Sequence, residues 1–537
     1  MTRARTFNLA DLFEIVASCV PERLAFRCGP QQLSYRELDR RATQLASALH
    51  GRGIRRGDNV GIQLYNSAAY LETFFACCKI GAAPVNVNYR YVADELSYLF
   101  GTLELRALVY GEEFEAEVAA AVPRVPTLRT LVRVGRSEVP SGVLPYEPLV
   151  ASGCEELDDP DRSDNDIYML CTGGTTGMPK GVMWPHQALF FSALGGGSFY
   201  RQEGPIKTPE EIAEVASKGY PLRYLAIAPL MHGAALWASL VSLLSGQTVL
   251  MRDHVEFSAE QIWDLAVREH ANIISVVGDA MAMPLVAALK GHPGRWPLPA
   301  LKHIGSGGGL FSAHVQQDLR ELLNVTVADS MGSSEGGAFG GGAKPESGEG
   351  FIKLAPRPDL KVISIERDRF VGPGESGILV RVGNVAIGYW GDEQKSAETF
   401  ITLNGERVVI SGDMAKILED GSIVVLGRGS QCINSGGEKV FPEEVEEVLH
   451  RHESVADALV VGVPDPRWGN KVVAVVSLHP GAKPDAAALN AYCRGFLAGY
   501  KVPKEVVFVD QVARSPAGKA DYRWAKETAQ AKLAEAS

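Results

Sequence analysis

The stretch LCTGGTTGMPKGVMW, residues 170–184, combines glycines and threonines with a single lysine, Lys180, after a short apolar run. Consecutive backbone N–H groups in a glycine-rich turn form a concave site for anions, and hydroxyl groups and a lysine add further donors. A phosphate group is therefore the predicted occupant. The P-loop pattern GxxxxGK[ST] does not fit, because Lys180 is followed by Gly181 instead of Ser or Thr.

The flanking residues predict where this stretch lies in the fold. Residues 167–170 are a candidate for a buried strand, and a helix is expected over residues 186–194. We therefore expect the glycine-rich loop to connect a strand to a helix.

Strands and helices alternate through the first part of the chain. Ser34 and Glu37 have the spacing of a capping box, and the apolar residues that follow fall on one helical face. From about residue 348 to 427 the pattern changes to short strands with turns. After Arg428 it becomes a compact α+β unit of about 110 residues, with a helix predicted over residues 442–450. Layered α/β structure is the predicted fold class.

Composition and charge limit the function. The chain has 537 residues, of which 46% are hydrophobic and 22% charged, and its formal net charge is −11. Nucleic acid is disfavoured as a partner, because phosphate backbones attract clustered Lys and Arg and the sequence has no basic stripe. The most apolar segment, residues 234–251, is interrupted by polar residues and falls short of the ~20 apolar residues of a membrane-spanning helix. We expect a buried helix and a strand there.

Targeting signals and cysteine usage indicate the compartment. The N-terminus has no long apolar stretch of the kind found in signal peptides. The eight cysteines show no CxxC pair and no metal-ligand spacing, which is typical of reduced thiols. We therefore expect a soluble, cytoplasmic protein without a transmembrane segment.

Five segments carry a resemblance to a known superfamily. Residues 172–181, TGGTTGMPKG, resemble the (S/T)GTTGxPKG signature of the adenylate-forming enzymes, which include acyl-CoA synthetases, peptide-synthetase adenylation domains and luciferases. A glycine turn without a ligand is the alternative for this loop taken alone. The other segments follow in the family's order: SMGSSEGG (330–337), VVISGDMAKILEDGSIVVLGR (408–428), INSGGEKVFPEEVE (433–446) and RSPAGKADYR (514–523). GDNVGI (57–62) and GAAPVNVNYR (81–90) fit as well, so the resemblance covers essentially the whole chain.

The resemblance is strongest to fatty-acyl and steroid-side-chain CoA ligases of the actinobacterial kind, on GRGS (427–430), SGGEKVFPEEVEE (435–447), GYKVP (499–503) and RSPAGKADYRWAK (514–526). It implies an α/β fold with a large N-terminal domain of several subdomains, residues 1–427, built from layered sheets and helices. A small, mobile α+β C-terminal lid domain would span residues 432–537. Residues 428–431 would form the hinge, with Ser430 where relatives usually have Asp or Lys.

The resemblance also assigns nucleotide-binding residues. It implies that the glycine-rich loop and Lys180 hold the β- and γ-phosphates of ATP, and that Asp413 accepts the ribose hydroxyls. Glu335 would hold Mg²⁺, which prefers hard oxygen ligands, with Thr172 as a second ligand. Met331 stands where relatives usually have a tyrosine, so a thioether replaces the aromatic ring beside adenine. The implied ATP- and AMP-binding residues are Thr172, Gly173, Gly174, Thr175, Thr176, Gly177, Lys180, Gly307, Gly308, Gly309, Asp329, Ser330, Met331, Gly332, Ser334, Asp413 and Arg428.

Catalytic, CoA-binding and acyl-binding residues are implied in the same way. Lys519 would reach the substrate carboxylate and the α-phosphate when the lid closes, and His232 would gate the acyl pocket. A surface lysine and a core histidine are the alternatives for these two. Glu335 completes the implied catalytic set. Gly436, Gly437 and Lys439 would bind CoA, although the glycines alone could form a simple turn. The implied acyl pocket consists of His232, Trp237, Met281 and Gly308.

The resemblance implies an ATP-dependent ligase that joins a carboxylic acid to CoA through acyl-AMP, with ATP and CoA as co-substrates and Mg²⁺ as cofactor. The expected acid is a large hydrophobic monocarboxylate, either a fatty acid or a steroid side-chain acid, because no Lys or Arg is clearly placed to pair a second carboxylate. Aryl acids are the alternative substrates. An enzyme that loads a carrier protein and a non-catalytic nucleotide-binding protein are the alternative functions. A homodimer is compatible with the resemblance.

Overall fold

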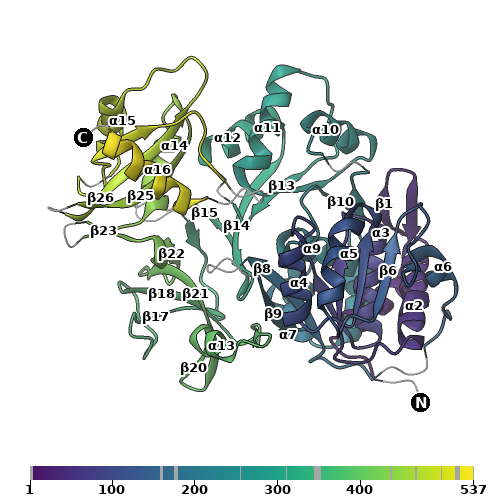
Figure 1. Cartoon of the computed structure of the whole chain (residues 1–537). Helices are drawn as coiled ribbons and strands as arrows, with labels where there is room; N and C mark the ends of the chain where they lie inside the picture. The colour runs from purple at the N-terminus through teal and green to yellow at the C-terminus, as the bar shows by residue number, and fades with distance from the viewer. Residues whose placement is uncertain are drawn as a thin grey trace.

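The computed structural model describes residues 4–157, 161–173, 179–253, 256–309, 311–343, 352–435, 438–465, 468–497, 499–514 and 520–535. Figure 1 shows a large N-terminal domain of layered sheets and helices and a smaller C-terminal domain beside it, which agrees with the predicted fold class. Within the described ranges no helix has the length and apolar character needed to cross a membrane.

The described strands form three sheets. The largest has the order β17 (Leu360–Ile363), β18 (Ser376–Val382), β21 (Glu406–Ile417), β22 (Ile423–Arg428), β16 (Ile352–Leu354), β15 (Gly337–Ala343), β14 (Thr326–Ser333), β13 (His303–Gly307), β12 (Ile273–Val276), β10 (Arg223–Ala226), β11 (Thr248–Met251), β1 (Leu24–Cys28) and β2 (Gln31–Ser34), with β20 (Phe400–Leu403) on β21. The second has the order β19 (Gly388–Tyr389), β9 (Pro179–Pro185), β8 (Ile167–Gly173), β4 (Ala83–Asn86), β3 (Asn59–Gln63), β5 (Ala107–Gly111), β6 (Thr130–Val134) and β7 (Leu144–Pro145).

The third sheet lies in the C-terminal domain and consists of β24 (Glu438–Val440), β23 (Ile433–Ser435), β26 (Gly469–Leu478) and β25 (Val455–Asp465), with β27 (Glu505–Phe508) on β26. The α-helices are α1 (Leu9–Cys19), α2 (Tyr35–Gly51), α3 (Ala68–Lys79), α4 (Ala93–Thr102), α5 (Glu115–Ala121), α6 (Tyr146–Ala151), α7 (His186–Ser192), α8 (Ile212–Lys218), α9 (Gly233–Leu244), α10 (Ala259–Arg268), α11 (Gly278–Gly291), α12 (Ala313–Leu322), α13 (Glu393–Thr399), α14 (Pro442–His450), α15 (Ala486–Arg494) and α16 (Tyr522–Glu535).

Local sequence signals account for several of these elements. The Ser34 hydroxyl accepts the Glu37 N–H at 3.2 Å, and the Glu37 carboxylate accepts the Ser34 N–H at 2.7 Å, so the predicted capping box begins α2. The predicted helix and strand within residues 234–251 are α9 and β11. The helix predicted over residues 442–450 is α14, with Pro442 at its first position, where a proline loses no helical hydrogen bond.

The position of the glycine-rich loop differs from the prediction. We expected a strand to lead through the loop into a helix, and this is wrong. Residues 179–185 form β9, which pairs antiparallel with β8 before α7 begins at His186. Val182 and Trp184 are buried, and pairing with β8 gives their backbone groups the partners that burial requires. The loop therefore joins the two strands of a hairpin.

The two domains meet closely at the end of β22. Gly427 has a φ of +139°, and a Cβ atom there would lie 2.5 Å from Glu443 Oε2 and 3.0 Å from Phe441 Cβ. Only glycine fits such a close approach without a shift of its neighbours. Helix α14 of the C-terminal domain therefore packs directly against β22.

Candidate active site

The glycine-rich hairpin places two of the predicted phosphate-binding residues opposite each other. Thr172 on β8 and Lys180 on β9 are cross-strand partners, and Gly173 pairs with Pro179 at the end of the hairpin. The residues between them, Gly174, Thr175, Thr176 and Gly177, lie outside the described residues. The described strands thus place Thr172 and Lys180 side by side next to the glycine-rich connection of the hairpin.

Lys180 is held by a segment that follows β18. Its Nζ lies 2.8 Å from Asp392 Oδ2 and 5.4 Å from the centroid of the Tyr389 ring. The Tyr389 hydroxyl donates a hydrogen bond of 2.9 Å to Glu335 Oε1. One aromatic ring therefore contacts the two charged residues that were predicted to handle the phosphates and the metal ion.

The turn that carries Glu335 is fixed by side chains from three elements. Trp184 of β9 donates from its indole N–H to the Ser334 carbonyl at 2.8 Å, and the Ser192 hydroxyl donates to the Gly336 carbonyl at 3.2 Å. Arg381 of β18 donates to the Gly336 carbonyl at 3.2 Å. This arginine is fully buried, and burial lowers its pKa to about 10. Buried donors of this kind hold the turn in one geometry.

The donor set around Glu335 fits Mg²⁺ bound with a nucleotide. Glu335 is half-buried, and the Thr172 hydroxyl and phosphate oxygens would complete a set of hard oxygen ligands. Among the described residues, His, Cys, Asp and Glu side chains form no group of three that could hold a metal ion by themselves. Mg²⁺ in nucleotide sites is usually held by one or two carboxylates together with phosphates, so one carboxylate suffices here.

The predicted adenine side lies at the ends of two neighbouring parallel strands. Gly307 of β13 pairs with Ser330 of β14, and Asp329 is the preceding residue. Burial raises the pKa of the Asp329 carboxyl to about 7. Met331 is half-buried and packs partly against the apolar cluster around Phe339.

Gly308 and Gly309 extend the same edge of the sheet. Gly308 has a φ of +85°, and a Cβ atom there would meet open space. The edge formed by residues 307–309 and 329–332 therefore has open space beside Gly308.

The predicted ribose-binding residues come from one hairpin. Asp413 on β21 is buried and is the cross-strand partner of Arg428 on β22. The Ser411 hydroxyl accepts the N–H of Asp413 at 3.1 Å. The side chain of Arg428 lies outside the described part of the chain.

Two asparagines hold the loop that carries His232, a residue of the predicted acyl pocket. Asn66 accepts the Leu230 N–H at 2.8 Å and donates to the Ala228 carbonyl at 2.9 Å. Asn86 donates to the Met231 carbonyl and accepts the Cys171 N–H at 2.7 Å. Asn86 therefore ties the His232 loop to the strand that enters the phosphate hairpin.

Two tryptophans pack behind this loop. The rings of Trp184 and Trp237 lie edge to face with centroids 6.1 Å apart. The indole N–H of Trp237 is buried without a hydrogen-bond partner among the described residues. Met281 packs against the apolar clusters on both sides of the largest sheet. Trp184 is part of one apolar cluster, and Trp237 and Met281 pack against it.

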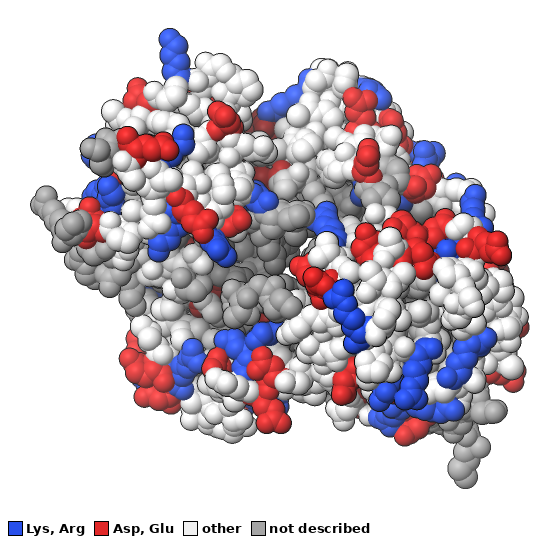
Figure 2. All heavy atoms as spheres, in the orientation of Figure 1, with Lys and Arg blue, Asp and Glu red and all other residues white. Residues whose placement is uncertain are grey.

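A cluster of ionisable side chains lies where the domains meet. Glu447 and His450 of α14 interact electrostatically with Asp279 of α11, and Glu447 also interacts with His314 of α12. Burial raises the pKa of Glu447 to about 7, and the nearby Asp279 carboxylate adds to this rise. Burial disfavours the His450 cation, but its hydrogen bond to Asp457 at 3.0 Å and the Asp457 charge raise the pKa of His450. Figure 2 shows that the surface is hollowed where the two domains meet.

Replacing Glu447 with glutamine is expected to flatten the pH dependence of thermal stability. The pKa of Glu447 rises from 4.5 to about 7 on folding, so its contribution to stability is fully present below pH 4.5 and is lost as pH rises through 7. We expect the melting temperature of the unmodified protein to fall by about 2–4 °C more than that of Glu447→Gln across this interval. Calorimetry at closely spaced pH values measures this, with Glu453→Gln, at an exposed position of the same domain, as the control. Parallel pH profiles for Glu447→Gln and the unmodified protein would contradict the prediction.

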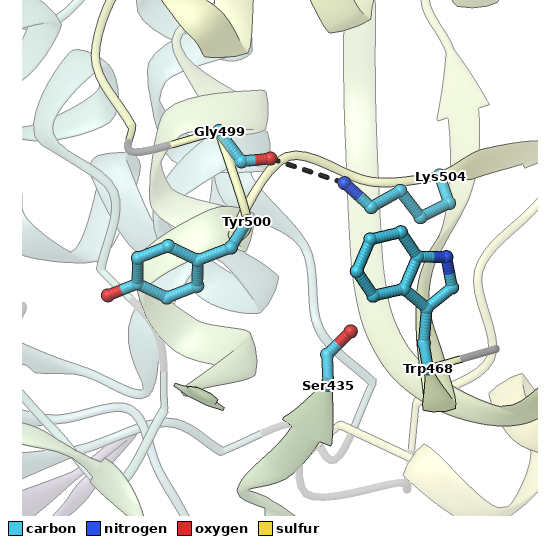
Figure 3. A pocket seen from close by; sticks show the side chains of 5 residues that line it. All are labelled: Ser435, Trp468, Gly499, Tyr500 and Lys504. Atoms are coloured by element: carbon cyan, nitrogen blue, oxygen red, sulfur yellow. Dashed lines mark hydrogen bonds between the residues drawn. The ribbon is translucent and has the colours of Figure 1, made fainter. Parts of the chain in front are cut away.

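The C-terminal domain contains an open cavity of about 250 Å³ next to the predicted CoA-binding loop. It is lined by Ser435, Trp468, Gly499, Tyr500 and Lys504. Figure 3 shows the Lys504 chain over the Trp468 indole, with the Tyr500 ring on the other side. Lys504 Nζ lies 5.4 Å from the Trp468 ring centroid and donates to the Gly499 carbonyl at 3.3 Å. Ser435, which lines the cavity, directly precedes the predicted CoA-binding residue Gly436 in the sequence.

Several predicted residues fall outside the described structure. Lys519, Gly436 and Gly437 lie outside the described ranges, and only the backbones of Lys439 and Ser430 are described. Gly429–Gln431 forms a single 3-10 turn between β22 and β23. The described parts bring together Thr172 with Lys180, Lys180 with Glu335 through Tyr389, and Asp413 with the backbone of Arg428.

Sequence reasoning missed the residues that support the site. Tyr389, Asp392, Arg381 and Asn86 contact predicted site residues or the loops that bear them. The GYWGD segment, residues 388–392, contains two glycines, two aromatic residues and an acid in a region of short strands. This composition could have indicated a segment with a fixed backbone bend that positions functional side chains.

The chain matches two family models. Residues 13–390 match the model described as AMP-binding enzyme, and residues 444–519 match the AMP-binding enzyme C-terminal domain. The first model alone spans more than half of the chain.

Known proteins are similar over nearly the full length. The medium/long-chain-fatty-acid–CoA/3-oxocholest-4-en-26-oate–CoA ligase of Mycobacterium tuberculosis is 42% identical over 99% of this chain and 98% of its own. The 3-oxocholest-4-en-26-oate–CoA ligase of Rhodococcus rhodochrous is 41% identical over 97% of this chain and 95% of its own. The crystal structure of the anthranilate CoA ligase AuaEII with anthranoyl-AMP covers 100% of this chain and 99% of its own at 22% identity and a TM-score of 0.82, which shows a shared fold. The chain therefore belongs to the AMP-binding enzyme family.

Proposed function

We propose that this protein is an AMP-forming acyl-CoA synthetase that activates a large hydrophobic monocarboxylic acid with MgATP and then transfers the acyl group to CoA. The observation that carries the proposal is the meeting of Lys180 and Glu335 at Tyr389, with Lys180 at the connected end of the hairpin formed by β8 and β9. A cation for phosphates and a carboxylate for Mg²⁺ are what nucleotide activation requires at one place.

In the first step, the acid attacks the α-phosphorus of ATP and pyrophosphate leaves. We assign Thr172, Lys180 and residues 173–177 to the phosphates, Asp413 and Arg428 to the ribose, and the edge formed by residues 307–309 and 329–332 to adenine. Mg²⁺, held by Glu335 and Thr172, would neutralise charge on the phosphate oxygens. Lys519 would donate to the substrate carboxylate and the α-phosphate, where negative charge develops.

In the second step, the CoA thiol displaces AMP. We assign Gly436, Gly437 and Lys439 to the pantetheine arm, as the resemblance implies. The neighbouring cavity offers the Trp468 and Tyr500 rings and the Lys504 ammonium, which suit a stacked base and a phosphate. We therefore place the nucleotide end of CoA in this cavity. Rotation about Ser430 would exchange Lys519 for the CoA-binding loop.

The proposed acid is a medium- or long-chain fatty acid or a steroid side-chain acid. The activities of the two relatives, each more than 40% identical to this chain, support this assignment. The apolar cluster that includes Trp184, with Trp237 and Met281 packed against it, is compatible with it, and we assign His232 to the gate of the acyl pocket. Because ATP and CoA are intracellular co-substrates and all eight cysteines are free thiols, we also propose a cytoplasmic location.

Incubation with ATP, CoA and a panel of acids is expected to yield acyl-CoA, AMP and pyrophosphate in equal amounts. The panel would contain fatty acids of different lengths, a steroid side-chain acid and an aryl acid, with products identified by mass spectrometry. We expect the highest kcat/KM for a fatty or steroid acid. ADP as the nucleotide product would overturn the proposal. Acyl-AMP that is transferred to a carrier protein but not to CoA would instead support a carrier-loading enzyme.

A further inference from the structure

We propose that Tyr389 and Asp392 are positioning residues that hold Glu335 and Lys180 in place before MgATP binds, and that Asp392 is the counter-ion that the phosphates displace from Lys180. This inference rests on the proposed function and adds two residues to its machinery. It comes from the contacts of the five-residue segment 388–392 with both charged side chains.

Tyr389 connects the two charges through one ring. Its side chain is buried, its hydroxyl donates to Glu335 Oε1 at 2.9 Å, and Lys180 Nζ lies 5.4 Å from the ring centroid. The hydrogen bond fixes one carboxylate oxygen of Glu335 and leaves the other for a ligand. The ring face offers the ammonium a weak, non-anionic contact that phosphates do not have to displace.

Asp392 neutralises Lys180 with one oxygen and caps a helix with the other. Its Oδ2 lies 2.8 Å from Lys180 Nζ, and its Oδ1 accepts the Lys395 N–H at 2.9 Å at the start of α13. The cap fixes the carboxylate independently of the lysine. Because the two side chains are 23% and 35% exposed, a polyanion can compete for the ammonium without unfolding the segment.

The backbone of the segment is fixed by strand pairing and by α13. Gly388 and Tyr389 pair with Met183 and Val182, and the Trp390 N–H donates to the Gly181 carbonyl at 2.9 Å. The Tyr389 N–H donates to the Ser396 hydroxyl at 2.8 Å. The φ of Gly388 is +153°, and a Cβ atom there would lie 3.0 Å from that hydroxyl. These contacts fix the backbone of Tyr389 and therefore the position from which its side chain reaches Glu335.

The test compares Tyr389→Phe, Asp392→Asn and Glu335→Gln with the unmodified protein. Tyr389→Phe keeps the ring and removes only the hydrogen bond to Glu335, so we expect the Mg²⁺ requirement to rise and kcat/KM for ATP to fall by about 10-fold. In a Glu335→Gln background the same change should have little further effect, because Tyr389 acts through that carboxylate. Asp392→Asn should lower the KM for MgATP by about 2–5-fold, since the anion that competes for Lys180 is gone.

A binding measurement accompanies the kinetics. Titration of MgATP in the absence of acid, followed calorimetrically, should show tighter binding for Asp392→Asn and weaker, more Mg²⁺-dependent binding for Tyr389→Phe. Matched controls are Tyr110→Phe, which removes a tyrosine–glutamate hydrogen bond of 3.1 Å elsewhere, and Glu406→Gln, which breaks a lysine–glutamate pair of 2.6 Å. Both controls should bind MgATP like the unmodified protein.

The outcomes separate this inference from the proposed function. If the unmodified protein neither binds MgATP nor forms acyl-CoA, the proposed function fails. If it does both, and Tyr389→Phe and Asp392→Asn behave like their controls, the positioning roles are wrong. If Tyr389→Phe lowers kcat/KM for ATP equally with and without the Glu335→Gln substitution, Tyr389 does not act through Glu335. Should Tyr389→Phe fail to fold, Asp392→Asn decides alone, because a KM for MgATP that is unchanged or raised contradicts the counter-ion role.

Discussion

Lys519→Ala is expected to reduce acyl-AMP formation by about 10²–10³-fold or more, while thioester formation from supplied acyl-AMP is largely retained. The expected loss of acyl-AMP formation is the usual effect of removing a positioned hydrogen-bond donor from a site where negative charge develops. In the proposed mechanism Lys519 acts on the substrate carboxylate and the α-phosphate, and it leaves the site once the lid turns. The lysine therefore has no task in the second half-reaction.

Arg514 and Ala520, on either side of residues 515–519, are both held by contacts within the C-terminal domain. Arg514 and Ala520 form an antiparallel bridge, and Arg514 donates to both carboxylate oxygens of Asp457 at 2.7 and 2.6 Å. The bridge and the paired arginine anchor both ends of the segment that carries the lysine. Alanine at position 519 should consequently leave the fold of the C-terminal domain intact.

The two half-reactions are measured separately, by pyrophosphate release and by acyl-CoA formation from synthetic acyl-AMP. Lys526→Ala, which removes an exposed lysine from α16 of the same domain, is the control and should retain both rates. If Lys519→Ala lowers both half-reactions equally, its assignment to the adenylation step is wrong.

Ser430→Pro should separate the two half-reactions in a different way. Ser430 is the middle residue of the 3-10 turn Gly429–Gln431 that joins the domains. Residues in such turns have a φ of about −50° to −70°, which is the range that proline imposes. Proline should therefore fit this turn and resist the change in backbone angles that rotation of the C-terminal domain requires.

We expect adenylation to persist and thioester transfer to fall by about 100-fold in Ser430→Pro. That loss corresponds to the ~3 kcal/mol that proline costs in an unsuitable backbone conformation. Ser430→Ala leaves the backbone free and should retain both rates. If the proline variant loses both rates together, or neither, residue 430 is not the hinge.

Local sequence patterns predicted the elements whose determinants lie within one turn or one helix. The capping box of Ser34 and Glu37 and the proline-initiated helix α14 are examples, because each depends on residues three or four positions apart. Strand β9 was not predicted, because what makes these residues a strand is their pairing with β8 and not their own sequence pattern. Residues 179–185 contain two prolines and a glycine, which weaken the strand signal until pairing with β8 is known.

The same distinction applies to the site. The residues that would touch the nucleotide lie in short motifs, so the sequence identified Lys180, Glu335 and Asp413 as candidates. Tyr389 and Asp392 belong to none of these short motifs. Their contacts depend on the pairing of β19 with β9, two segments about 200 residues apart in the chain. No periodicity in the sequence encodes such a pairing.

The two-residue strand β19 makes the site more fragile than the fold that carries it. It is the edge strand of the second sheet, and its contacts with β9 join the region that bears Asp413 to the phosphate hairpin. Short edge strands open at a small fraction of the free energy of global unfolding. One such opening would release Glu335 from Tyr389 and Lys180 from Asp392 at the same moment, while the buried sheets stay intact. The enzyme can therefore lose its activity reversibly by local unfolding, at temperatures where its helices and core still persist.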